Sequence, residues 1–162
     1  MAQKTFKSIR ALKEHAREQA KIILRTTVLS AARKALREAI KESYNEYTSS
    51  ADNPYKRREY RRGGLLDRNY MMDYISSDGL SVRVRQESPS PVGGKYLVDV
   101  YVTRGDLYNW ESSEIYGLQP FPRDFYFYAK FKLEEKLPDL VKEAFEQRGI
   151  KAERIDVNVR FK

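Results

Sequence analysis

The sequence predicts an α+β protein: a long N-terminal helix, a small, mostly antiparallel sheet of three to four strands, one C-terminal helix packed on the sheet, and a closing strand. Three observations predict this class. Apolar residues recur at helical spacing over the first 47 residues, with no Gly or Pro before Pro54. Short segments of the second half alternate apolar and polar residues, and a second helical repeat ends near residue 148.

The first element is expected to be a helix over residues 3–47, because Ala, Lys, Arg, Glu and Leu dominate this stretch. The β-branched residues of Thr26-Thr27-Val28 weaken its middle. We therefore expect either one long helix or two helices joined by a bend near residues 25–30. A single helix of about 44 residues would be about 66 Å long, so its first half either folds back or projects toward another chain.

Residues 48–69 are expected to form a long linker, in which Pro54 ends the helix and Gly63-Gly64 ends a basic block. The sheet follows, with predicted strands over residues 70–76, 80–85 and 95–103.

A second long loop is expected over residues 104–122, followed by a helix over 124–148 in which Pro138 causes a kink or a restart. Gly149 is placed to end this helix as its C′ residue. Ile155, Val157, Val159 and Phe161 alternate with polar residues and predict the closing strand.

The charge is concentrated in the N-terminal part of the chain. Of a net charge of +8, the excess lies in the first 70 residues, and residues 1–50 alone carry 11 basic and 5 acidic side chains. We therefore divide the chain into a basic helical extension, 1–29, and a single α+β domain, 30–162, with long loops at 48–69 and 104–122. A basic arm on a neutral body favours an anionic partner, either nucleic acid or an acidic protein surface.

Composition argues against most catalytic chemistry. The chain has no Cys, and His15 is its only His, which disfavours thiolate nucleophiles, cysteine metal sites and histidine-based triads. The chain contains neither of the glycine-rich motifs that bind phosphates in nucleotide-binding proteins, G-x-x-x-x-G-K-[ST] and G-x-G-x-x-G. The N-terminus lacks the apolar core of a secretory signal, and no stretch is apolar enough to cross a membrane. We expect a protein with no enzymatic activity, no cofactor, no metal ion and no membrane partner.

Tyrosines surround the basic block of the linker, and this pattern has three interpretations. It is typical of protein interfaces, which are enriched in Tyr and Arg; of single-stranded nucleic-acid binding by stacking; and of a loop whose tyrosines anchor it while its arginines are solvated. A separate basic stripe in the first helix recurs at spacings of three or four and is expected to face DNA or an acidic protein. Its members are Lys4, Lys7, Arg10, Lys13, Arg17, Lys21 and Arg25.

Two stretches carry a family resemblance. Tyr44, Tyr47, Pro54-Tyr55, Arg57-Arg58 and Gly63-Gly64-Leu65-Leu66-Asp67 form one pattern. Gln119-Pro120-Phe121-Pro122-Arg123, followed by a helix ending in residues 145–151 (FEQRGIK), forms the other. Together they resemble the tail-completion, or head–tail joining, virion proteins of long-tailed bacteriophages, over residues 30–162.

The resemblance implies a structural protein of the virion neck at the top of the tail, assembled in the host cytoplasm. Such proteins form a homo-oligomeric ring, often a hexamer, that joins the tail tube to the head connector and lets DNA pass through its lumen. The expected partners are therefore other copies of the chain, the connector or adaptor protein and the tail-tube protein. The residues expected to dock them are Tyr44, Tyr47, Tyr55, Arg57, Arg58, Tyr60, Arg61, Arg62, Leu65, Leu66, Trp110 and Phe121.

The leading hypothesis is thus a non-enzymatic protein of the phage head–tail interface. The alternative is a basic nucleic-acid-binding protein that uses residues 1–70, with non-specific, phosphate-directed contacts. A small nuclease is a third class, which the lack of a histidine acid–base pair disfavours.

Overall fold

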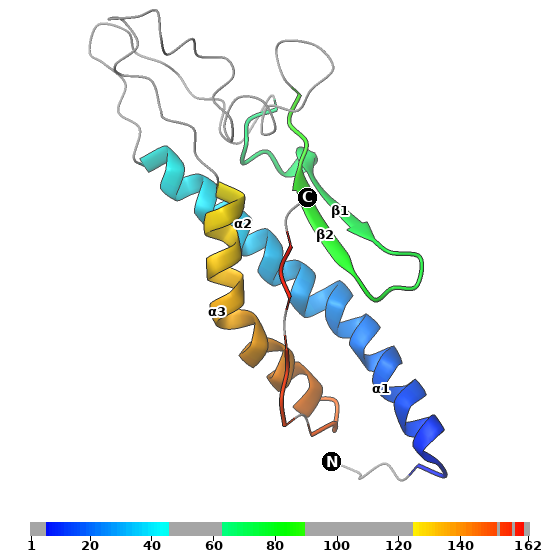
Figure 1. Cartoon of the computed structure of the whole chain (residues 1–162). Coiled ribbons are helices and arrows are strands. Elements are labelled where there is room, and N and C mark those ends of the chain that lie inside the picture. Colours follow the sequence, from blue (N-terminus) through cyan, green and yellow to red (C-terminus); the bar gives the residue numbers. More distant parts are fainter. Residues whose placement is uncertain (1–5, 46–62, 90–124, 152, 157, 161–162) are drawn as a thin grey trace, which may run out of the picture. The chain divides into compact units, whose positions relative to one another are not determined.

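The structure is a computed structural model, and it describes residues 6–45, 63–89, 125–151, 153–156 and 158–160. Figure 1 shows the elements in chain order. They are α1 (Ile9–Ile23), the π-helical turn η1 (Leu24–Val28), α2 (Leu29–Asn45), the 3₁₀ helix η2 (Arg68–Tyr70), β1 (Met71–Ile75), β2 (Val82–Gln86) and α3 (Phe125–Glu146). A long N-terminal helix, an antiparallel two-stranded sheet and a C-terminal helix make this an α+β protein, as predicted, whereas the strand predicted over 95–103 lies outside the described residues.

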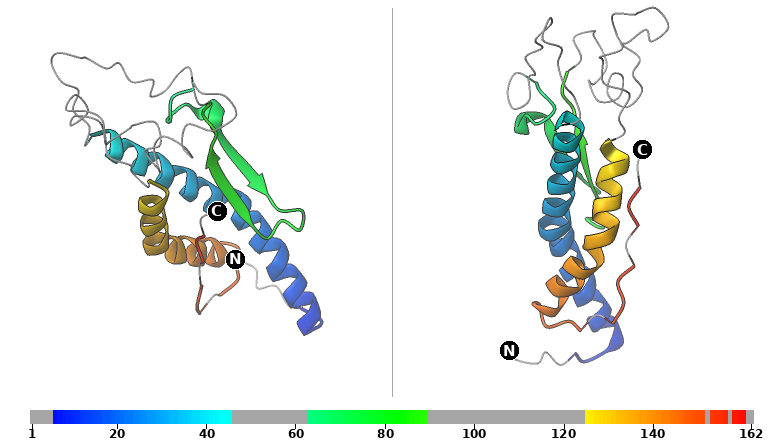
Figure 2. Two further views of the ribbon diagram at one scale, coloured as in Figure 1. Left: turned by 45° about the horizontal axis from the view of Figure 1, so that its top comes forward. Right: turned by 90° about the vertical axis from the view of Figure 1, so that its left-hand side faces the viewer.

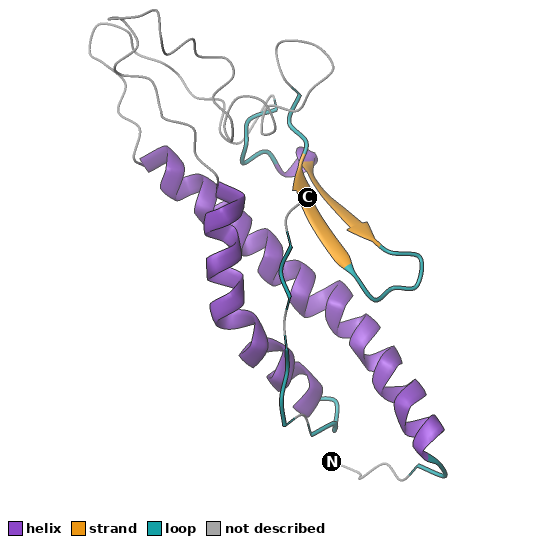
Figure 3. Ribbon diagram, viewed as in Figure 1, coloured by secondary structure: helices purple, strands orange, loops and turns teal. Residues whose placement is uncertain are grey.

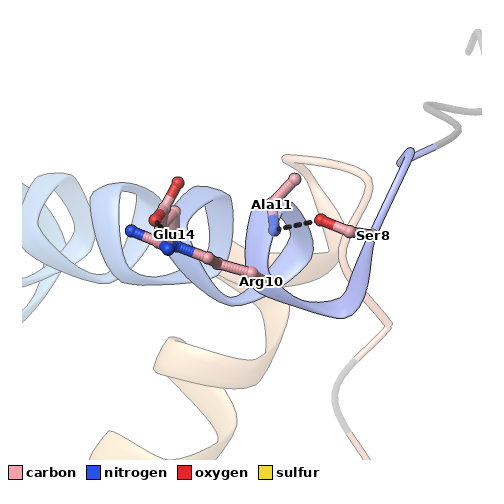
Figure 4. A network of polar contacts seen from close by, with 4 residues as sticks. All are labelled: Ser8, Arg10, Ala11 and Glu14. Atoms are coloured by element: carbon pink, nitrogen blue, oxygen red, sulfur yellow. Dashed lines mark hydrogen bonds and ion pairs between the residues drawn. The ribbon is translucent and has the colours of Figure 1, made fainter.

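The N-terminal helix begins at Ile9, six residues later than the sequence predicts. Ser8 has extended backbone angles, and its hydroxyl oxygen accepts a hydrogen bond from the Ala11 N–H at 3.1 Å, as Figure 4 shows. A serine in this position satisfies one of the amide groups that have no partner inside the helix. The start of the helix is therefore set by its N-cap rather than by the apolar repeat.

The β-branched middle of the helix forms a π-helical turn, which confirms the irregularity expected near residues 25–30. The Leu29 N–H donates to the Leu24 carbonyl, five residues earlier, and the Thr26 hydroxyl donates to the Ile22 carbonyl at 2.8 Å. Side-chain bonds of this kind compete with the regular helical ladder. The backbone stays helical through the turn, so α1, η1 and α2 follow one another without a loop.

The chain divides into two compact units, which do not coincide with the predicted boundary at residue 30. Unit 1 combines residues 1–34, 73–84 and 130–162, and unit 2 combines 35–72 and 85–129. Residues 1–29 are joined to unit 1 because Ile23 is buried in one hydrophobic cluster with three residues of α3, namely Leu137, Val141 and Ala144. The predicted extension therefore contributes to a core of its own chain.

The C-terminal segment lies against helices, and its described residues form no strand. Ile155 and Val159 pack on the cluster of Ile23 and α3, whereas Asp156, Asn158 and Arg160 are exposed. Figure 3 shows the described part of this segment as loop. The predicted closing strand is therefore not formed in residues 153–156 and 158–160, although Ile155 and Val159 are partly buried against the cluster.

The end of α3 follows the prediction for Gly149. The Ile150 N–H donates to the Phe145 carbonyl and the Gly149 N–H to the Glu146 carbonyl, which is the bonding pattern of a Schellman cap. Gly149 has a φ of +77°, a conformation that favours glycine. Pro138 lies inside the helix, and Figure 2 shows α3 changing direction partway along, as a proline without an N–H predicts.

Unit 2 contains a buried turn formed by residues 63–67. The Asp67 carboxylate accepts hydrogen bonds from the Gly63 and Asn69 amides, both at 3.1 Å. Gln86 donates to the Leu65 carbonyl at 2.6 Å, and Ser88 donates to the Gly64 carbonyl at 3.0 Å. These bonds satisfy the polar groups of a turn that is otherwise closed to water. Among the described residues of this unit, the other buried side chains come from α2, β1 and the start of α3: Ala35, Leu36, Ala39, Ile40, Met71, Phe125 and Ala129.

Candidate interaction site on the N-terminal helix

The basic stripe predicted in the first helix lies at the surface of unit 1. Arg10, Lys13, Arg17 and Arg25 are exposed, and Lys21 is half-buried. Lys7 is exposed but precedes the helix, so it is not part of the helical stripe. Lys4 lies outside the described residues.

Acidic neighbours on the same helix neutralise part of this stripe. Arg10 Nε lies 3.0 Å from a carboxylate oxygen of Glu14, and Lys21 Nζ lies 2.7 Å from one of Glu18. The hydrogen bond and the charge of Lys21 lower the pKa of Glu18. Lys13 and Arg17 form no ion pair with any residue in the part of the chain that the structure describes. Both side chains are exposed, and the charge of Arg17 also helps to lower the pKa values of Glu18 and Asp78.

The turn of the β1–β2 hairpin packs on the C-terminal part of the stripe. A Cβ added at Gly79 would lie 3.3 Å from Nη2 of Arg25 and 3.4 Å from Cγ and Cδ of Lys21. Arg33, at the start of α2, holds the hairpin with a two-pronged pair to Asp73 at 2.7 and 2.6 Å. The hairpin turn therefore contacts the stripe at Lys21 and Arg25 and leaves Lys21 half-buried, whereas Arg10, Lys13 and Arg17 are exposed.

An acidic side chain of the hairpin turn contributes to this arrangement. The Asp78 carboxylate accepts hydrogen bonds from the Ser76 hydroxyl at 2.6 Å and the Leu80 amide at 3.0 Å. These bonds, with a further contribution from the charge of Arg17, lower the pKa of Asp78. The carboxylate therefore stays ionised beside the basic helix at neutral pH.

Apolar side chains lie next to the exposed part of the stripe. Ile9 is 74% exposed and Leu12 is 43% exposed. Leu12 follows Ile9 by three residues and Ile23 follows Leu12 by eleven, so the three side chains share one side of the helix. Of these three, only Ile23 belongs to the buried cluster. Figure 1 shows the first turns of α1 lying apart from α3, which explains why this side is uncovered there. We name Ile9, Arg10, Leu12, Lys13 and Arg17 the α1 docking face.

The predicted docking residues of the linker and second loop are mostly outside the described residues. Tyr44 lies in α2, and its side chain is not described. Leu65 and Leu66 are 4% and 1% exposed, so their side chains belong to the interior of unit 2 and are not available to a partner. The docking role predicted for these two leucines does not fit this structure, because the turn that carries them is buried. Those outside the described residues are Tyr47, Tyr55, Arg57, Arg58, Tyr60, Arg61, Arg62, Trp110 and Phe121.

Two further features of the sequence bear on the site. Leu12 falls three residues after Ile9 and extends the apolar side of α1, a spacing visible in the sequence. Acidic residues recur on α3 at Glu135, Asp139 and Glu143, at the four-residue spacing that places them on one side of a helix.

Within the described ranges, no three His, Asp or Glu side chains gather closely enough to hold a metal ion. Among these residues, no helix is long and apolar enough to cross a membrane. Comparison with protein-family models, curated proteins and solved structures gives no significant match to this chain.

Proposed function

We propose that this chain is a non-enzymatic structural protein of a phage virion at the head–tail interface. In this proposal it forms an oligomeric ring that joins the tail tube to the head connector in the neck of the particle. The observation that carries it is the α1 docking face. Ile9 and Leu12 are exposed beside unpaired Lys13 and Arg17, on a part of the helix that its own unit leaves uncovered.

An exposed apolar side chain next to a basic one favours a protein partner. Isolated apolar residues at a surface are common, but a helical side that continues from a buried core is shaped for packing. The resemblance of residues 63–67 and 145–151 to tail-completion proteins supports the same assignment. The proposal includes a third strand over residues 95–103 that completes the sheet, because a two-stranded hairpin is only marginally stable on its own.

The linker arginines supply the test of the head–tail role. In particles assembled with this chain as the only source of the protein, Arg57→Ala with Arg58→Ala should leave the chain folded and heads and tails unjoined. Arginine binds carboxylates with two parallel hydrogen bonds, so its loss weakens docking on an acidic neighbour. The matched control is Arg154→Ala with Arg160→Ala, which removes the same charge from an exposed segment. Normal yields of joined particles from the Arg57 and Arg58 variant would contradict the proposal.

A specific observation favours a second candidate, nucleic-acid binding. Lys13 and Arg17 are exposed and unpaired among the described residues, and unpaired cations on a helix attract phosphates. Filter binding to duplex DNA over a salt series separates the two functions. Affinity that falls steeply with salt, in a chain that stays monomeric, would favour the nucleic-acid function. Rings in electron micrographs with no DNA retained at low salt would favour the virion function.

A further inference from the structure

Unit 1 has a second charged surface, on the side of α3 that faces away from its core. Leu137, Val141 and Ala144 are buried, whereas Glu135, Asp139, Glu143 and Glu146 are exposed. We name these four residues the α3 acidic stripe. Steps of four, four and three residues place them on one side of the helix, and the exposed Lys136 and Lys142 lie at its two edges, so this side keeps a net negative charge. Among the described residues, the one side-chain hydrogen bond of these carboxylates is the 3.1 Å bond that Glu143 accepts from the side-chain amide of Gln147.

The α3 acidic stripe complements the α1 docking face in charge and in spacing. Lys13 and Arg17 are four residues apart, as are Asp139 and Glu143, and four residues of helix rise by about 6 Å. Rows of side chains at this spacing are the ridges that most often interlock when two helices pack. Leu140 is 39% exposed at the border of the stripe and offers apolar surface to Leu12.

The two surfaces belong to the same unit, yet they do not pair within one chain. No ion pair between described residues joins α1 to α3. Figure 1 and the left view of Figure 2 show the first turns of α1 away from α3. Opposite charges with matching spacing are thus both presented outward.

We propose that the α1 docking face of one copy binds the α3 acidic stripe of a second copy of this chain. The contact joins two different surfaces, so each copy can bind one neighbour through α1 and another through α3. Such heterologous contacts close into rings when the rotation between copies allows it. The inference deepens the proposed function, on which it rests, by naming the surfaces that join adjacent subunits.

A nucleic acid is the competing occupant of the α1 docking face. Phosphates pair with Lys13 and Arg17 but leave Ile9 and Leu12 in contact with water. The α3 helix of a second copy offers carboxylates to Lys13 and Arg17 and offers the apolar side chain of Leu140 to Ile9 and Leu12. The composition of the face therefore favours a copy of this chain over DNA.

Charge exchange between the two surfaces tests the proposal. Variant A carries Lys13→Glu and Arg17→Glu, and variant B carries Asp139→Lys and Glu143→Lys. Each variant alone places like charges on both surfaces, so its dissociation constant for self-association should rise at least about tenfold over that of the parent. An equimolar mixture of A and B should associate again, because the α1 of each variant then faces an α3 of opposite charge. Sedimentation velocity measures the self-association of the parent, of each variant and of the mixture. Circular dichroism verifies that the variants fold.

The control variant is Arg154→Glu with Arg160→Glu, which changes the net charge as much as variant A does at exposed positions elsewhere. It should self-associate like the parent. If the parent forms rings and A and B also form them, the pairing of α1 with α3 is overturned while the proposed ring stands. If the parent stays monomeric at all concentrations, the ring and the pairing both fail. If variant A loses duplex DNA binding and the mixture with B stays dissociated, the face binds nucleic acid instead.

Discussion

Replacing Gly79 by alanine measures how closely the hairpin turn packs on the basic side of α1. Gly79 has a φ of +71°, and an added Cβ would lie 3.3 Å from Nη2 of Arg25 and 3.4 Å from Lys21. The left-handed conformation costs an L-residue about 1–2 kcal/mol. The smaller entropy of the unfolded alanine chain offsets about 0.4–1 kcal/mol of this. The backbone alone should therefore lower the free energy of unfolding by about 1 kcal/mol.

The contact with α1 adds a second cost. Forcing a methyl group into a packed site costs about 1–3 kcal/mol, and the flexible side chains of Lys21 and Arg25 favour the low end. Gly79→Ala should therefore lower the free energy of unfolding by about 2 kcal/mol in total. Gly149→Ala is the matched control, because Gly149 has a φ of +77° and a Cβ there would meet nothing within 4 Å. It should cost about 1 kcal/mol.

Urea unfolding followed by circular dichroism gives both values from the transition midpoints. Lys21→Ala in the Gly79→Ala background should recover about 1 kcal/mol, because it removes the methylene groups that the new Cβ meets. Equal losses for Gly79→Ala and Gly149→Ala would refute the packing of the hairpin on α1. A recovery by Lys21→Ala of the same size in the Gly149→Ala background would refute it as well.

Two further predictions concern the charged surface of α1 and its hairpin. Ser8→Ala removes the acceptor of the Ala11 amide, a cap worth about 1 kcal/mol, so hydrogen exchange of that amide should accelerate about fivefold; unchanged exchange would exclude the cap. The folded-state pKa of Asp78 is lowered, so the stability that it contributes is present above its ordinary pKa of 3.8 and is lost as the pH falls through the lowered value. Acidification below about pH 4 should lower the melting temperature less in Asp78→Asn than in the parent, and an equal fall would show that Asp78 contributes nothing.

Local sequence signals predicted the elements of this fold because the physics behind them acts within a few residues. The weak middle of the first helix follows from three β-branched neighbours, and the end of α3 follows from Gly149. Strand β2 follows from the alternation of apolar and polar residues, and the end of β1 follows from the turn residues Asp78 and Gly79. The same signals misplaced the helix start, because a serine cap prevailed over an apolar repeat that continues to Phe6.

The candidate site could be predicted in part. The sequence by itself determined that Arg10, Lys13 and Arg17 share a side of one helix, because helical spacing alone dictates it. Only the tertiary structure decided that the hairpin turn contacts the stripe at Lys21, since Gly79 is 58 residues away in the chain. It also decided that Leu12 stays uncovered while Ile23, on the same side, is buried.

The buried turn of unit 2 shows the same division. The sequence of residues 63–67 indicates a glycine-rich turn, and from the sequence its two leucines are expected to dock a partner, whereas the structure buries them. Gln86 and Ser88 make this burial possible, because their side chains bond the Leu65 and Gly64 carbonyls across more than 20 residues of chain. A residue's neighbours in sequence determine its conformation, whereas its burial depends on distant segments that satisfy its polar groups, and those partners appear only when the chain is folded.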